Sequence, residues 1–256
     1  QTFSPTSNFN GSDLGANIGG GTAPPWVFLA GSGDEYDTQK IVYLSPSFSG
    51  FDFGLMYSPS AFNSLAGCTL PATGCSNLTS SGNPLDGARY VNMIAGGARF
   101  SGDVGPVNVL AYGVYSYAGH VNSSASAATA RAAVSAPASS SWNGQFDNLS
   151  FGSMGVALTW QGFTVAANYI TGAMNGRMAA RPAGGAGVNA WLAGAQYRTV
   201  PLTVGAVFAS INSQGGIAMT GLTQRQEYEF NVGGSYALAP GMVVFADYIY
   251  PVSYTH

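Results

Sequence analysis

The segment Lys40–Pro59, KIVYLSPSFSGFDFGLMYSP, carries the pattern that decides the fold. It predicts two strands joined by a tight turn at Ser47-Phe48-Ser49-Gly50. In the second strand, polar or small side chains alternate with an apolar row made of Phe51, Phe53, Leu55 and Tyr57. A period of two is typical of a strand whose two faces meet different environments. Because aromatic residues lie at both ends of the apolar row, the segment predicts a transmembrane β-hairpin.

The composition agrees with a protein whose surface is covered by lipid. Only 7% of the 256 residues are charged, against about 25% in ordinary soluble domains. Such a chain is expected to aggregate in water unless another solvent covers it. The content of 46% hydrophobic and 12% aromatic residues argues against a disordered polypeptide. A net charge of −3 leaves no basic face for a nucleic-acid partner.

The same strand pattern recurs along the chain after an irregular segment at residues 1–39. About ten strands are expected, and tight turns alternate with long polar loops near residues 60–89, 122–148, 172–187 and 212–224. This alternation is typical of outer-membrane barrels, whose periplasmic turns are short and whose external loops are long. No stretch predicts a transmembrane helix. Residues 1–10 lack the pattern of a signal peptide, so we expect a mature, processed or truncated form of an exported protein.

The faces of the later strands carry the same alternation. Between residues 226 and 237, an apolar row is formed by Tyr228, Phe230, Val232, Gly234 and Tyr236. Glu227 and Glu229 lie on the opposite face, and turning their carboxylates toward lipid would be costly. We therefore predict that Glu227 and Glu229 face the lumen. In the segments 105–120 and 242–251, polar and apolar residues alternate less clearly. The sequence therefore does not determine which of their residues face lipid and which face the lumen.

Other chemistry has little support in the sequence. Cys68 and Cys75 are spaced for a small loop-closing disulfide in an oxidising compartment, and no further ligands near them indicate a metal. Ten-stranded outer-membrane proteases need acidic residues and a histidine at the external rim. Here His120 has no acidic neighbour in sequence and His256 is the last residue. No nucleophile or phosphate-loop motif occurs, so we expect neither an enzyme nor a bound cofactor.

Two segments resemble the trimeric general diffusion porins of Gram-negative bacteria: KIVYLSPSFSGFDFG at residues 40–54 and YALAPGMVVFADY at residues 236–248. The resemblance covers most of residues 36–251. It implies an antiparallel transmembrane β-barrel in the bacterial outer membrane, and a homotrimer that passes small hydrophilic solutes and ions. Membrane lipid and lipopolysaccharide are the other partners that it implies. Family members usually have about sixteen strands, so the chain resembles part of such a barrel; if it is complete, a ten-stranded barrel is required.

The resemblance also implies where solutes are selected. In such porins an acidic inward-folding loop faces basic residues on the barrel wall, and the field between them filters solutes. Residues 1–39 would contain that loop and residues 40–256 the barrel strands. The acidic candidates are Asp34, Glu35 and Asp37, and the basic wall candidates are Lys40, Arg89, Arg99 and Arg198.

Alternatives stay open for several of these residues. The three acidic residues are also suited to solubilising an exposed turn. Arg99 and Arg198 lie close to short turns, where they would line the periplasmic mouth instead. Arginines in loops or at strand edges are equally suited to contact with external lipopolysaccharide or solvent: Arg89, Arg177, Arg181 and Arg225.

The aromatic residues have two interpretations as well. Those beside short turns or in apolar rows are expected to form a girdle at the membrane interface: Tyr43, Phe51, Phe53, Tyr57, Phe100, Trp160, Phe163 and Tyr197. A sugar channel lined with aromatic residues is the second interpretation. The alternative from a different functional class is a surface-displayed structural or adhesive β-barrel protein, in which the Ala/Ser-rich loop at 122–148 would be a spacer.

Overall fold

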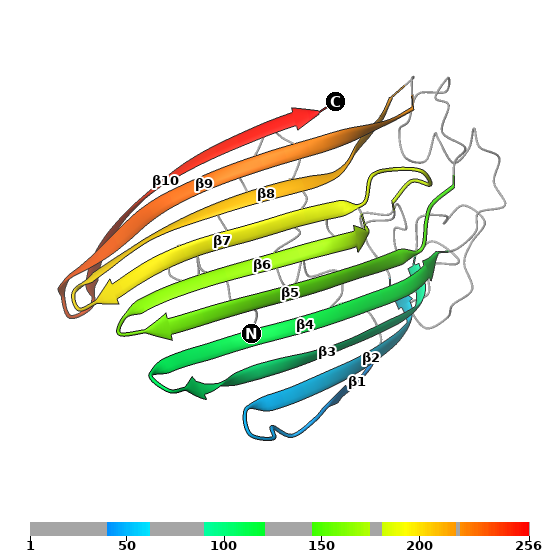
Figure 1. Cartoon of the computed structure of the whole chain (residues 1–256). Helices are drawn as coiled ribbons and strands as arrows, with labels where there is room; N and C mark the ends of the chain where they lie inside the picture. Colours follow the sequence, from blue (N-terminus) through cyan, green and yellow to red (C-terminus); the bar gives the residue numbers. More distant parts are fainter. Residues whose placement is uncertain (1–39, 62–89, 121–144, 175–180, 219–220, 256) are drawn as a thin grey trace.

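The computed structural model describes residues 40–61, 90–120, 145–174, 181–218 and 221–255, and all the regular structure of these residues is β. These residues form a ten-stranded sheet (Figure 1) whose strands are β1 (Ile41–Leu44), β2 (Phe51–Ala61), β3 (Tyr90–Val104), β4 (Val107–His120), β5 (Leu149–Trp160), β6 (Phe163–Ala173), β7 (Val188–Thr199), β8 (Leu202–Ala218), β9 (Gly221–Ala239) and β10 (Met242–Thr255). The predicted all-β antiparallel fold with ten strands is confirmed.

The strands follow one another across the sheet in chain order, and each pairs antiparallel with the next. Figure 1 shows the sheet curving from β1 to β10, which form its two edges. Within the part of the chain that is described, no helix is long and apolar enough to cross a bilayer.

The short turns have sequences that suit the twist of the sheet. Between β1 and β2, Ser49 and Gly50 have φ values of 52° and 87°, and the amide of Phe51 donates to the carbonyl of Phe48 at 2.9 Å. Between β5 and β6, Gln161 and Gly162 have φ values of 46° and 86°. Positive φ at both central residues is the conformation of type I′ hairpin turns, whose twist matches that of the flanking strands.

The connection between β8 and β9 corrects one prediction. A polar loop was expected at residues 212–224, but β8 continues to Ala218 and β9 begins at Gly221. Polar side chains do not prevent backbone pairing here: Ser213 pairs with Arg225, and the register shifts between Gln214 and Ile217. The strict alternation of short and long connections is therefore wrong at this hairpin.

The two faces of the sheet differ in the way that the sequence predicts. We call the face that carries Phe53 the outer face and the face that carries Asp52 the inner face. The predicted apolar row of β2 is exposed on the outer face, with exposed fractions from 42% for Tyr57 to 59% for Phe51. Because paired residues on neighbouring strands lie on the same face, the register assigns the residues of the other strands to the outer or the inner face.

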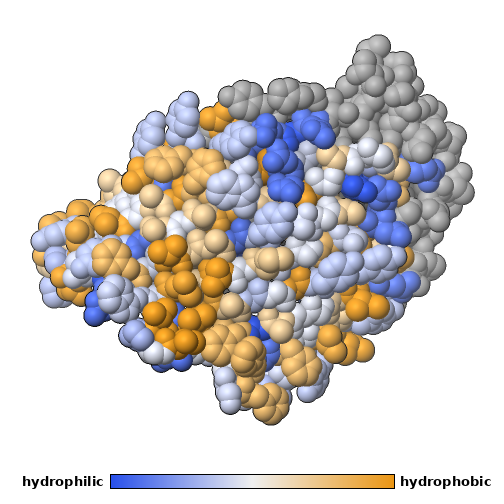
Figure 2. All heavy atoms as spheres, viewed as in Figure 1, coloured by the Kyte–Doolittle hydropathy of each residue, from blue (hydrophilic) through white to orange (hydrophobic). Residues whose placement is uncertain are grey.

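Aromatic side chains form two bands on the outer face. Near the short turns, the rings of Phe163 and Tyr197 lie 4.3 Å apart. Toward the opposite strand ends, the rings of Trp191 and Phe208 lie 5.0 Å apart. Tyr197 lies six positions after Trp191 on β7, which is about 20 Å of strand. Figure 2 shows hydrophobic and weakly polar residues over the short-turn half of this face, with strongly hydrophilic residues gathering toward the other end.

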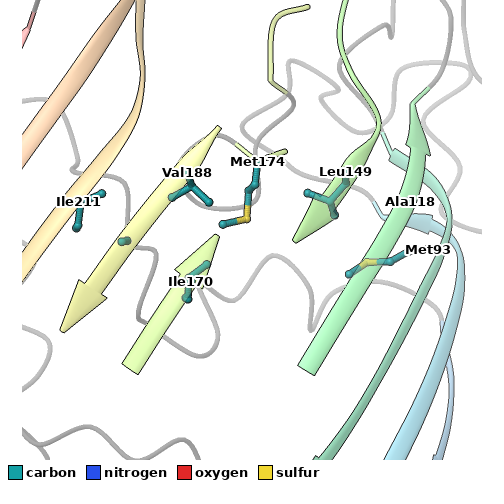
Figure 3. Packing of buried hydrophobic residues seen from close by; sticks show 8 residues of the cluster. Met93, Ala118, Leu149, Ile170, Met174, Val188 and Ile211 are labelled. Atoms are coloured by element: carbon teal, nitrogen blue, oxygen red, sulfur yellow. The ribbon is translucent and has the colours of Figure 1, made fainter. Parts of the chain in front are cut away.

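The inner face is not uniformly polar. Near the strand ends opposite the short turns, it carries a buried apolar cluster from β3 to β8 and the residue after β6 (Figure 3): Met93, Ala118, Leu149, Ile170, Met174, Val188, Ala190 and Ile211. The charged groups of the sheet also lie on the inner face, beside a second buried apolar cluster of Leu192, Val207 and Ala209.

Candidate functional site

Every Asp, Glu, Lys and Arg within the ten strands lies on the inner face. The paired registers place there Asp52, Arg99, Asp103, Arg198, Arg225, Glu227, Glu229 and Asp247. The outer face of the same strands carries none of these residue types, and large apolar side chains are exposed on it. A strict division of this kind is expected where one face meets hydrocarbon and the other meets water, because a charge on the lipid face is costly.

A polar row crosses the inner face from β2 to β6. Arg99 donates to Asp52 through Nη2 at 2.8 Å and through Nε at 3.2 Å, both to Oδ2. Tyr112 is paired with Arg99 on the next strand. Its hydroxyl accepts a hydrogen bond from Nδ2 of Asn168 at 2.5 Å.

Gly155 makes this long reach possible. It lies between Tyr112 and Asn168 in the register, and a Cβ at this position would meet Cε1 of Tyr112 at 2.5 Å. The Tyr112 ring therefore lies directly over Gly155, and the hydrogen bond to Asn168 holds its hydroxyl end in place. A second row nearer the short turns is built similarly from cross-strand pairs, with Asn108 donating to Asp103 at 2.8 Å.

The acidic residues of β9 are the most deeply buried charges on the inner face. Glu227 and Glu229 are 4% and 6% exposed, and Asn231 beside them is 5% exposed. Two positions along a strand separate the carboxylates by about 7 Å of backbone. Arg225 approaches Glu227 at 3.5 Å. Oε1 of Glu229 has no hydrogen-bond partner among the residues that the structure describes.

A family profile with the description Gram-negative porin matches residues 1–251. The chain belongs to the Gram-negative porin family. It is therefore a bacterial outer-membrane protein of the transmembrane β-barrel type, as the division of charge between its faces requires. No curated protein matches it.

The structure places four of the predicted pore residues of this porin on the inner face: Arg99, Arg198, Glu227 and Glu229. Arg99 is neutralised locally by Asp52. Arg198 is exposed and is the residue before the last in β7, next to the short turn. Lys40 lies immediately before β1. The other predicted residues are outside the described part of the chain: Asp34, Glu35, Asp37, Arg89, Cys68 and Cys75.

Two arginines expected at loops or strand edges have carboxylate partners within the porin. Arg181 donates through Nη2 to Oδ2 of Asp147 at 2.6 Å, and the amide of Asp147 donates to the carbonyl of Arg181 at 2.8 Å. This pair joins the segment before β5 to the segment before β7. Arg225 lies on the inner face against Glu227. Arg177 is outside the described residues.

Sequence reasoning missed the polar row, although part of its signal was present. Asp52 alternates with the apolar row of β2, which gives its face but not its partner. Its pairing with Arg99 follows only from the register of β2 and β3. Tyr112 lies in a segment that alternates weakly, so the sequence did not determine its face. Among the described residues, no group of His, Cys, Asp or Glu is arranged to hold a metal ion.

Proposed function

We propose that this porin forms a water-filled channel through the outer membrane for the passive diffusion of small hydrophilic solutes and ions. The observation that carries the proposal is the confinement of every charged strand residue to the inner face. A lumen wall of charged and hydrogen-bonding groups lets solutes exchange their hydration for contacts with the wall.

Single-channel recording in planar bilayers tests this function. Stable ohmic conductance is the expected result for the folded protein. Folded protein that inserts without conducting would remove the channel and favour the structural or adhesive role. The folded state must be shown independently, for example by far-UV circular dichroism of the same sample.

The constriction is proposed to lie between the acidic residues of the 1–39 segment and the basic wall. Its acidic side would be Asp34, Glu35 and Asp37, and its basic side Lys40, Arg89, Arg99 and Arg198. The exposure of Arg198 on the inner face supports a role in the field of the lumen. Arg99 contributes a dipole more than a net charge, because Asp52 lies against it.

Neutralising the three acidic residues together to Asn, Gln and Asn tests the constriction. We expect the ratio of cation to anion permeability, measured as a reversal potential in a KCl gradient, to fall. An unchanged reversal potential would contradict the assignment without affecting the channel itself. Arg198→Gln is the opposite test and should raise the same ratio.

We further propose a homotrimer, with part of the apolar outer face buried between protomers and the rest in contact with membrane lipid and lipopolysaccharide. The large exposed apolar side chains of the outer face support both contacts. Chemical cross-linking of the protein in bilayers, with protomer number read on denaturing gels, tests the assembly. Only monomers at all cross-linker concentrations would contradict it.

A further inference from the structure

The inner face of the first four strands is hollowed into a groove of about 690 Å³. Its floor lies on β2 and β3, where Gly54 pairs with Gly97 and the neighbouring Ala95 carries only a methyl group. One wall comes from β1 and the residues after it, and the other comes from β4. The inner-facing side chains of these walls are Val42, Leu44, Leu110, Tyr112 and Val114.

The groove is charged at one place and mostly apolar elsewhere. Among the described residues that line it, only Asp52 and Arg99 are charged, and their side chains are 25% and 44% exposed. Both partners of the ion pair are therefore accessible from the groove. An exposed pair of this kind adds little to stability, so a solute can replace one partner's contact with its own at small cost.

The positive and negative groups constrain the chemistry of the ligand. A simple anion attracted by Arg99 would meet the carboxylate of Asp52, and a simple cation would meet the guanidinium. An uncharged polar solute could hydrogen-bond to either group but would offset neither charge, so its contacts would be weaker. A solute that carries both charges, together with an apolar part for the apolar walls, matches the whole groove.

We propose that the groove is a binding site for small zwitterions with an apolar side chain, such as an apolar α-amino acid. Arg99 donates to the solute carboxylate, and Asp52 accepts from its ammonium group through charge-assisted hydrogen bonds. The apolar side chain lies against Leu44 and Val114, whose own side chains lie over Gly54 and Gly97. The site rests on the proposed channel function, because solutes reach it through the lumen.

The groove is formed before a ligand arrives. The Tyr112 ring is held over Gly155 by its bond to Asn168. A Cβ on Gly97 would meet Cγ2 of Val114 at 2.7 Å, so the Val114 side chain lies against the floor. A preformed site loses little conformational freedom on binding.

The test measures how solutes lower the KCl current of the channel in planar bilayers. The probes are leucine, leucinamide, which lacks the carboxylate, and 4-methylpentanoate, which lacks the ammonium group. We expect leucine to lower the current at the lowest concentration. Each analogue should need at least about tenfold more, because one charge-assisted contact is lost. Equal concentrations for all three would overturn the proposal, and this comparison needs no variant.

Variants then assign the two charges. Asp52→Asn should raise about tenfold the leucine concentration that lowers the current, and it should leave the concentration needed for 4-methylpentanoate unchanged or lower it. Arg99→Gln should raise the concentration needed for both solutes. Asp103→Asn is the matched control, since it removes an inner-face carboxylate outside the groove lining. It should leave the leucine concentration that lowers the current unchanged. No effect of Asp52→Asn in a conducting channel would refute the site. Absence of all conductance would refute the channel function instead.

Discussion

Placing one positive charge on each face of the sheet gives a sharp prediction about stability. Val232 is on the outer face of β9, four residues from Tyr228 and four from Tyr236, and is 42% exposed. Val232→Arg would place a guanidinium near the middle of the apolar band. The expected loss in free energy of unfolding is about 2–4 kcal/mol, the cost of a cation near the bilayer midplane.

Val114→Arg is the matched control, because it makes the same substitution at a similarly exposed site (38%) on the inner face. We expect its cost to stay below about 1 kcal/mol, as for an exposed substitution. Both variants would be folded into phospholipid vesicles and titrated with urea, with tryptophan fluorescence reporting unfolding. If the two losses agree within about 0.5 kcal/mol, or if Val114→Arg costs more, the assignment of the faces is refuted.

Three further predictions concern packing and ion pairs. Gly155→Ala should lower the free energy of unfolding by about 1–3 kcal/mol, because its methyl group would strike the Tyr112 ring; the loss should largely vanish in a Tyr112→Ala background, and a persisting loss would contradict this cause. Phe163→Ala and Tyr197→Ala should show a coupling of about 0.5–1.5 kcal/mol in a double-mutant cycle, whereas strict additivity would count against an interaction between the two rings. Arg181→Ala should cost about 1 kcal/mol or less in low salt, and a cost that does not shrink in 1 M KCl would argue against an ion pair as its source.

The alternation of polar and apolar residues along single strands was sufficient to predict the fold class. It also predicted, for most strands, which side chains face lipid and which face the lumen. In β2 and β9, charged and small residues alternate with aromatic and aliphatic ones, and a one-residue slip would turn Glu227 and Glu229 toward the other side. The pattern of each strand therefore determines which of its two faces meets lipid. The tight turn between β1 and β2 could also be predicted from the sequence, since the Ser49-Gly50 pair is compatible with positive φ.

The polar row and the groove could not be predicted, because both depend on the pairing of separate strands. Asp52 and Arg99 are 47 positions apart in the sequence, and the sequence gives no direct indication that they are opposite. Tyr112 and Asn168 meet across a strand that lies between them, through space left by Gly155. The prediction fails at the β8–β9 hairpin for a different reason: its polar composition is typical of a loop, but the backbone of these residues pairs as strand.

The most direct measurement of the central claim is a nitroxide scan along residues 51–57 of β2 in bilayers, in a background with Cys68→Ser and Cys75→Ser. Spin labels would be introduced one position at a time. Their collisions with oxygen, which concentrates in hydrocarbon, and with a water-soluble nickel complex would be compared. We predict that oxygen access is greatest at Phe51, Phe53, Leu55 and Tyr57 and nickel access at Asp52, Gly54 and Met56. Equal nickel access at both sets, or the opposite alternation, would contradict a sheet with lipid on its outer face and water on its inner face.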